Sequence, residues 1–290
     1  MFRTDLFSGK SILVTGGGSG LGKAMATRFA GLGADVTILG RRRDVLEAAA
    51  AEIRNKTGRA VQTIGADIRN PEVVARAMDE LFASRPLDAL VNNAAANFVA
   101  RTETLSHRAA DAVLATVLHG SLYCTLEAGR RWIARGLPGT VLSIVSPNAE
   151  TGSPYVVPSA MGKAGVLAMT RSLAVEWGRR GIRFVAIAPG SFPTPGAWRR
   201  VVPREDLAKR FETNNPLGRP GRHDELADLA AFLLSDRAGY INGECVTIDG
   251  GRWLKGAGGF SFLEELTEAE WDALRPAAKP DMAQAHGSNA

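Results

Sequence analysis

Length, composition and charge indicate a globular protein and exclude several functional classes. With 290 residues, 45% of them hydrophobic, the chain is long enough for one α/β domain with a substantial core. No apolar run approaches the roughly 18 residues of a membrane helix. The net charge of +5 comes from pairs and triplets of basic residues, with no basic stripe. We therefore expect no membrane or nucleic-acid partner, and small phosphate-bearing ligands suit the charge better.

The two cysteines give no sign of a metal site. Cys124 and Cys245 lie far apart, and neither has a cysteine or histidine neighbour at metal-binding spacing. We expect two buried thiols, no bound metal and a location in the reducing cytoplasm.

Apolar runs of strand length alternate with segments of helical period as far as about residue 250. The expected strands cover residues 11–14, 36–39, 60–64, 89–91, 141–145, 183–187 and 245–248. The amphipathic segments between them include residues 71–84, 105–134, 159–179 and 223–235. Runs that are apolar on both faces are typical of parallel strands covered by helices. The sequence therefore predicts an α/β fold with a parallel sheet of about seven strands.

Two segments depart from this alternation. Residues 189–222 are rich in proline and glycine, which predicts a long substrate loop with one short helix. After residue 251 the tail has one helix-like piece, residues 264–274, and then an end of disordered composition. We expect one domain over residues 1–255 and a partly disordered C-terminal extension over residues 256–290.

A glycine-rich segment, Thr15-Gly16-Gly17-Gly18-Ser19-Gly20-Leu21-Gly22, follows the first expected strand and opens a helix. Glycines permit a tight turn and a close approach of backbone N–H groups to a pyrophosphate at the helix N-terminus. This order of strand, loop and helix predicts a single-domain, doubly wound Rossmann fold that binds a dinucleotide. We assign Gly16, Gly18, Ser19, Gly20 and Leu21 to this site.

The end of the second expected strand indicates which dinucleotide is bound. NAD sites hold the ribose 2′-hydroxyl with a carboxylate there, but this chain reads Leu39-Gly40-Arg41-Arg42-Arg43. Arginine can instead bind a 2′-phosphate. We predict NADP as the cofactor, with Arg41 as its main contact, whereas Arg42 and Arg43 also fit exposed positions in the first turn of a helix.

Six elements in order resemble the short-chain dehydrogenase/reductase family over roughly residues 9–252. They are TGGGSGLG from Thr15, Ala66-Asp67-Ile68, Asn92-Asn93-Ala94-Ala95, Ser159 with Lys163, Ala188-Pro189-Gly190 and Ile248-Asp249-Gly250-Gly251. The resemblance implies that Asp67 and Ile68 flank the adenine, that Asn93 braces the fourth strand and that Lys163 holds the nicotinamide ribose. It also adds Ala94, Pro189, Gly190 and Thr194 to the cofactor contacts.

The usual acid position of that family is altered in this chain. The family has a tyrosine four residues before the lysine, but here that residue is Ser159, whose aliphatic hydroxyl is a far weaker acid. The asparagine of the family's fourth helix is also absent, and Val117 takes its place. Ordinary ketone or alcohol chemistry by the family's standard proton relay is therefore not expected.

A second set of motifs resembles the 2,4-dienoyl-CoA reductases, which have serine at the position of Ser159. The set comprises NNAAANF from Asn92, AETGS from Ala149, VVPSA from Val156, EWG from Glu176, PGA from Pro195 and AAFL from Ala230. The resemblance implies hydride transfer from NADPH to the far carbon of a conjugated dienoyl-CoA thioester. Hydrogen-bond donors then stabilise the negative charge on the thioester oxygen. The resemblance also implies a homotetramer.

The donors of that subfamily are an asparagine and a tyrosine, which align with Asn97 and Asn148. Two amides can stabilise an oxyanion but cannot supply a proton, which would come from water or from Tyr155. Each residue has a structural alternative: a loop cap for Asn97, a turn residue for Asn148 and a pocket-wall aromatic for Tyr155. We take Asn97, Asn148, Tyr155, Ser159 and Lys163 as the catalytic candidates.

The leading hypothesis is an NADPH-dependent reductase of a conjugated acyl-CoA thioester. Two alternatives stay open: an enzyme for another activated alkene or carbonyl compound, and a cofactor-binding protein with little turnover. The missing tyrosine keeps the last alternative open.

Overall fold

The computed structural model describes residues 2–194 and 204–274 and contains a parallel sheet of seven strands. The strands are β1 (Ser11–Thr15), β2 (Asp35–Gly40), β3 (Gln62–Gly65), β4 (Ala89–Asn92), β5 (Gly139–Ile144), β6 (Ile182–Pro189) and β7 (Cys245–Ile248). Their order across the sheet is β3-β2-β1-β4-β5-β6-β7. This is the doubly wound Rossmann arrangement that the sequence predicts. Its ligand crevice lies at the carboxyl ends of β1 and β4, where the strand order reverses.

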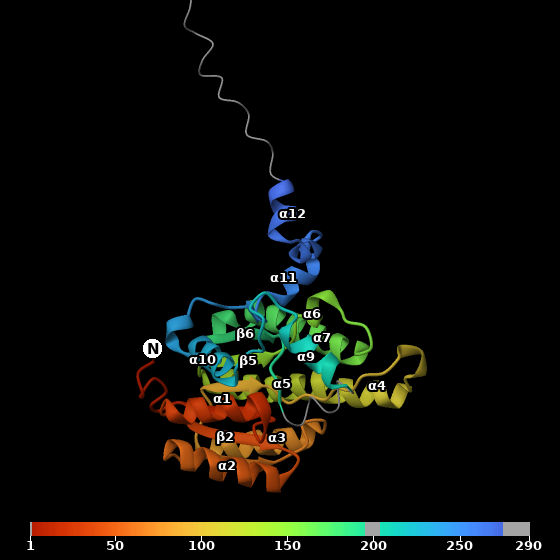
Figure 1. Cartoon of the computed structure of the whole chain (residues 1–290). Coiled ribbons are helices and arrows are strands. Elements are labelled where there is room, and N and C mark those ends of the chain that lie inside the picture. Colours follow the sequence, from red (N-terminus) through yellow and green to blue (C-terminus); the bar gives the residue numbers. More distant parts are fainter. Residues whose placement is uncertain (1, 195–203, 275–290) are drawn as a thin grey trace, which may run out of the picture. The chain divides into compact units, whose positions relative to one another are not determined.

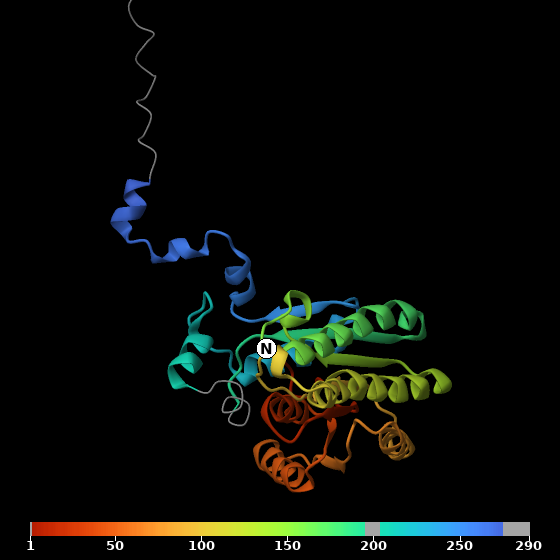
Figure 2. The same ribbon diagram turned by 90° about the vertical axis from the view of Figure 1, so that its right-hand side faces the viewer.

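Helices cover both faces of the sheet (Figures 1 and 2). The first part of the chain forms α1 (Gly20–Gly31), α2 (Arg43–Thr57), α3 (Pro71–Ser84), η1 (Thr102–Thr104), α4 (His107–Leu114) and α5 (Gly120–Arg135). There follow α6 (Asn148–Thr151), α7 (Val157–Glu176), η3 (Gly178–Arg180), α9 (Glu205–Thr213), α10 (His223–Leu234) and η4 (Asp236–Ala238). Sequence signals set these bounds, as at α3, where the Asn70 side chain accepts a hydrogen bond from Val73 N at 3.0 Å and Pro71 opens the helix.

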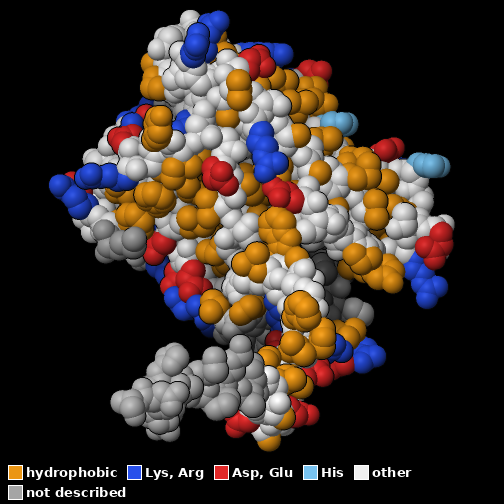
Figure 3. All heavy atoms as spheres, turned by 90° about the horizontal axis from the view of Figure 1, so that it is seen from above, with side chains coloured by type: hydrophobic (Ala, Val, Ile, Leu, Met, Phe, Trp, Pro, Cys, Tyr) orange, Lys and Arg blue, Asp and Glu red, His pale blue; other side chains and the backbone are white. Residues whose placement is uncertain are grey.

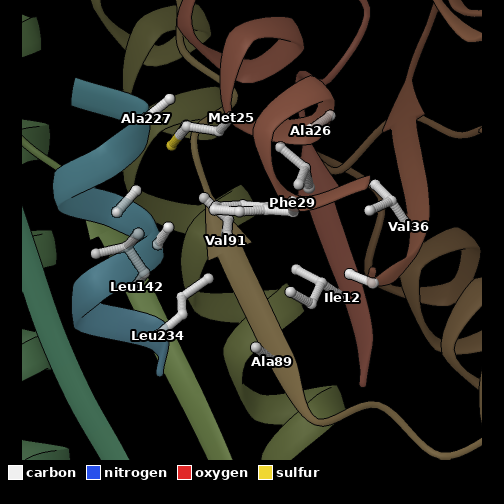
Figure 4. Packing of buried hydrophobic residues seen from close by; sticks show 14 of the residues in the cluster. Ile12, Met25, Ala26, Phe29, Val36, Ala89, Val91, Leu142, Ala227 and Leu234 are labelled. Carbon is white, nitrogen blue, oxygen red and sulfur yellow. The ribbon is translucent and has the colours of Figure 1, made fainter. Parts of the chain in front are cut away.

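The core lies in two layers because side chains alternate between the faces of each strand. Ile12 of β1 packs with Phe29 of α1 and with Ala227 and Leu234 of α10 on one face (Figure 4). Its neighbour Leu13 points to the other face and joins the cluster under α3 and α5. Both layers are needed to hold β1, whose carboxyl end begins the glycine-rich loop.

The segment expected as one helix over residues 105–134 is a continuous helical rod over residues 107–135. A π-helical turn, η2 (Ala115–His119), separates α4 from α5. By length and composition this rod could also cross a membrane. Its packing explains its apolar character: Cys124, Ala128 and Trp132 are buried in the core, and Trp132 Nε1 donates to Leu87 O at 2.6 Å.

The two irregular segments of the sequence are described only in part. The substrate loop expected over residues 189–222 contains the short helix α9, and its residues 195–203 lie outside the described residues. The chain divides into two units, residues 1–252 and 253–290, against an expected boundary after residue 255. The second unit carries most of α11 (Arg252–Ala257), then η5 (Ser261–Glu265) and α12 (Glu268–Ala273). The end expected to be disordered lies outside the described part.

Neither the surface charge nor the cysteines indicate a metal site or a strongly charged patch among the described residues. On the face drawn in Figure 3, charged side chains of both signs are interspersed with apolar ones. No group of His, Cys, Asp and Glu side chains in the described ranges is placed to bind a metal. Burial raises the pKa of the Cys124 thiol to about 12 and that of the half-buried Cys245 thiol to about 11, so both stay protonated.

Candidate active site

The glycine-rich loop between β1 and α1 is shaped for close contact with a dinucleotide. Gly16 has a φ of 65°, and a Cβ atom there would lie 2.9 Å from the Ala94 Cα atom. The N-terminus of α1 has no side-chain cap at Ser19 and no acidic residue in its first turn. Its free N–H groups and positive dipole end therefore suit an anionic pyrophosphate.

A hydrogen-bond network fixes this loop against the end of β4. Asn93 Nδ2 donates to Thr15 O at 2.9 Å and to Gly16 O at 3.3 Å. The Thr15 hydroxyl accepts from the backbone N–H groups of Asn93 and Ala94 and donates to Val91 O at 3.1 Å. Asn93 is thus a brace between two strand ends, which is the position that the resemblance implies.

Two arginines near the carboxyl edge of the sheet, one at the end of β2 and one beyond β3, differ in whether they are paired. Arg69 binds the Asp67 carboxylate through Nη2 at 2.6 Å and Nε at 3.0 Å, and this pairing holds the pKa of Asp67 below its usual value. Arg41 is exposed and makes no hydrogen bond or ion pair to any described residue. Arg42 is likewise exposed, lines the same cleft and makes no side-chain hydrogen bond or ion pair to the described residues, so both arginines are available to a phosphate.

One cleft of about 530 Å³ joins the dinucleotide loop to the catalytic candidates. It is lined by the expected residues Gly16, Gly18, Ser19, Gly20, Leu21, Arg41, Asp67, Ile68, Asn93, Ala94, Asn97, Asn148, Ser159, Lys163, Pro189 and Thr194. Gly190 is not among the residues that line it; its backbone N–H donates to Ile248 O at 2.9 Å and ties the ends of β6 and β7 together.

Lys163 is the buried cation of this cleft. It lies on α7, is 9% exposed, and its Nζ donates to Ile144 O at the end of β5. Burial lowers the pKa of Lys163 to about 8, because the protein interior disfavours the charged form. The ammonium group is thus held at the carboxyl end of β5, beside the cleft.

If Lys163 contacts the cofactor, its lowered pKa should make cofactor affinity depend on pH. The protonated amine is the better partner for ribose hydroxyls and phosphates, and protonation is lost as the pH rises through about 8. We expect the dissociation constant of NADPH to increase above that pH, by at most about tenfold per pH unit. Titrations of cofactor fluorescence from pH 6.5 to 9.5 check this. The same rise of the dissociation constant near pH 8 in Lys163→Met would contradict the assignment of this pH dependence to Lys163.

Several polar side chains line the cleft without a hydrogen bond to the described residues, and three of them are catalytic candidates. Ser159 lies in the first turn of α7, Asn148 begins α6, and Asn97 lies in the loop after β4. Ser159 and Asn148 are half-buried and Asn97 is exposed. Because their donors are not used within the protein, they are available to a polar substrate atom.

The expected role of Tyr155 as a proton donor or pocket wall is not met by the structure. Its side chain is 58% exposed and does not line the cleft. The protein has three tyrosines, all within the described ranges, and neither Tyr123 nor Tyr240 lines the cleft either. The cleft thus has amide, hydroxyl and ammonium donors but no phenol.

Sequence reasoning did not assign several residues of the cleft to the site, among them Thr116, Ser146 and Phe192. Ser146 directly follows the fifth strand run, and that place at the carboxyl edge of the sheet was a usable signal. Thr116 faces the cleft from the π-helical turn η2, which helical periodicity does not reveal.

Comparisons with known proteins find related oxidoreductases. A sequence profile described as "Enoyl-(Acyl carrier protein) reductase" matches residues 16–252. An uncharacterized oxidoreductase of Caenorhabditis elegans is 46% identical, over 91% of this chain and 87% of its own length. A probable 2,4-dienoyl-CoA reductase of Bacillus subtilis (strain 168), named as (2E)-enoyl-CoA-producing, is 43% identical over 84% of this chain and 97% of its own. The crystal structure of a short chain dehydrogenase from Bacillus anthracis superposes with a TM-score of 0.78 at 42% identity, covering 87% of this chain and 98% of that one.

Proposed function

Since the chain belongs to the short-chain dehydrogenase/reductase family, we propose that it is an NADPH-dependent reductase of a conjugated acyl-CoA thioester, of the 2,4-dienoyl-CoA reductase type. The observation that carries the proposal is the donor set of the cleft. Asn97, Asn148 and Ser159 line it together with Lys163, and no tyrosine does. Such donors suit a reaction that builds negative charge on a carbonyl oxygen more than one that needs a strong acid.

The protein's own groups would act in binding and charge stabilisation. The bound cofactor supplies the hydride. Lys163 would hold the nicotinamide ribose, and the amides of Asn97 and Asn148 would donate N–H groups to the thioester oxygen as charge accumulates there. We assign the proton that completes the reduction to solvent, because no tyrosine lines the cleft to donate it. The cytoplasmic location and the homotetramer stay predictions.

NADP selectivity would come from Arg41. If Arg41 binds the 2′-phosphate, NADPH should bind at least about tenfold more tightly than NADH, since a charge-assisted pair contributes about 1.5–3 kcal/mol. Arg41→Ala should remove most of this preference, and Arg76→Ala, which changes an exposed arginine on α3, should not. Dissociation constants for both cofactors, measured by fluorescence, check this. Equal affinities in the unmodified protein would refute the assignment.

The proposed function is tested with NADPH and a matched panel of substrates. The panel contains enoyl-CoA and dienoyl-CoA thioesters, unconjugated thioesters and simple ketones, and NADPH consumption is followed by absorbance. We expect turnover of the dienoyl-CoA to exceed that of every ketone. Faster reduction of a ketone would favour the alternative enzyme class, and no turnover of any compound would favour a cofactor-binding protein.

A further inference from the structure

The loop that presents Asn97 is held by one hydrogen bond. Residues 95–100 lie in no helix or strand between β4 and η1. Within the described ranges these six residues make a single hydrogen bond, from Ala100 N to Tyr155 O at 3.0 Å. The acceptor lies just before α7, the helix that carries Ser159 and Lys163. This bond therefore links the loop of Asn97 to the helix of the other catalytic candidates.

Tyr155 adopts a backbone conformation that tyrosine normally avoids. Its φ is 64°, and it is the one non-glycine residue in the described part of the chain with a positive φ. The ring does not account for this conformation, because it is 58% exposed and hydrogen-bonds to none of the described residues. A disfavoured conformation persists where its surroundings determine it, and such positions cluster at functional sites.

The surroundings that determine this conformation lie on both sides of Tyr155. The next residue, Val156, is buried at the N-terminus of α7, and its carbonyl oxygen accepts from Ala160 N at 3.0 Å. The carbonyl oxygen of Tyr155 itself accepts from Ala100 N. With Tyr155 in this left-handed conformation, the carbonyl of Val156 lies at the start of α7, and the carbonyl of Tyr155 lies against the loop of Asn97.

We propose that Tyr155 is a positioning residue: its left-handed backbone directs its carbonyl oxygen to Ala100 N and so holds Asn97 over the cleft beside Ser159. The phenol takes no part in the reaction. The inference rests on the proposed function for the role of Asn97 as an oxyanion donor, whereas the anchoring of the loop by Tyr155 does not depend on the substrate.

The backbone role predicts an unusual order among substitutions. Asn tolerates a left-handed conformation, Phe disfavours it as Tyr does, and a β-branched Val disfavours it most. Tyr155→Asn and Tyr155→Phe should therefore keep kcat within about threefold of the parent, and Tyr155→Val should lower it at least about tenfold. The dissociation constant of NADPH should change less than about twofold in all three, because Tyr155 does not line the cleft. Tyr240→Val is the matched control at a fully exposed tyrosine.

Two measurements separate this role from a general loss of structure. Hydrogen exchange of a peptide spanning residues 95–101 should be at least about tenfold faster in Tyr155→Val and unchanged in Tyr155→Asn and Tyr240→Val. In a double-mutant cycle, Tyr155→Val should lower kcat much less when Asn97 is already alanine, because it acts through Asn97.

Each contrary result overturns the inference in a recognisable way. A loss in Tyr155→Phe as large as in Tyr155→Val would make the phenol a chemical group. Unchanged exchange in Tyr155→Val would show that Tyr155 does not anchor the loop. If Tyr155→Val lowers kcat equally with Asn97 present and with Asn97 replaced by alanine, Tyr155 does not act through Asn97. If no thioester is reduced but exchange responds as expected, the anchoring stands, and the proposed function alone fails.

Discussion

Asn97→Ala should lower turnover of a dienoyl-CoA by about 10²–10³-fold and leave the affinity for NADPH nearly unchanged. A preorganised donor to a developing oxyanion has this magnitude of effect when it is removed. Asn97 lines the cleft, and its amide makes no hydrogen bond to the described residues, so its full donor capacity is available to the substrate. Steady-state kinetics and a cofactor titration measure the two quantities.

The control for this variant is Asn55→Ala, which removes an exposed amide on α2 remote from the cleft lining. It should leave both kcat and cofactor affinity unchanged. A loss in Asn97→Ala that is confined to KM would mean that the amide binds the ground state as well as the transition state. An unchanged kcat would remove Asn97 from the site.

Lys163→Ala should raise the dissociation constant of NADPH and reduce turnover, each by at least about tenfold. Its ammonium group is buried at the end of β5, so no solvent-exposed cation can replace it. Cofactor binding and hydride geometry should suffer together, because one side chain holds the ribose and thereby the ring attached to it. Fluorescence titration and single-turnover kinetics separate the two effects.

Arg54→Ala, at an exposed position on α2 that does not line the cleft, is the control for a lost surface charge. It should change neither quantity. If Lys163→Ala binds NADPH as the parent does and retains its turnover, the correspondence of Ser159 and Lys163 with the family's catalytic positions is misplaced.

The fold was predictable because its signals are local. Each expected strand lies within about two residues of an observed one. The central strands are buried on both faces and so form continuous apolar runs, whereas the edge strands β3 and β7 are exposed or half-buried. The dinucleotide loop was equally predictable, because a glycine-rich turn directly follows the first strand run and opens a helix. Both features follow from sequence alone without knowledge of distant contacts.

The parts that sequence reasoning misjudged depend on side-chain direction. Tyr155 lies near Lys163 in sequence, but its left-handed backbone leaves the ring in solvent and brings its carbonyl to Ala100. Thr116 reaches the cleft only because a π-helical turn shifts the helical period. Spacing along a chain does not report either effect, since both arise from local departures from regular backbone geometry.

The destination of the transferred hydride tests the central claim most directly. A dienoyl-CoA thioester is reduced with NADPH that carries deuterium at the reactive position of the nicotinamide, and the product is examined by NMR. We predict one deuterium on the far carbon of the original diene, with the second hydrogen taken from solvent. Deuterium on a carbonyl carbon, or label confined to the products of added ketones, would contradict conjugate reduction by the donor set of Asn97, Asn148 and Ser159.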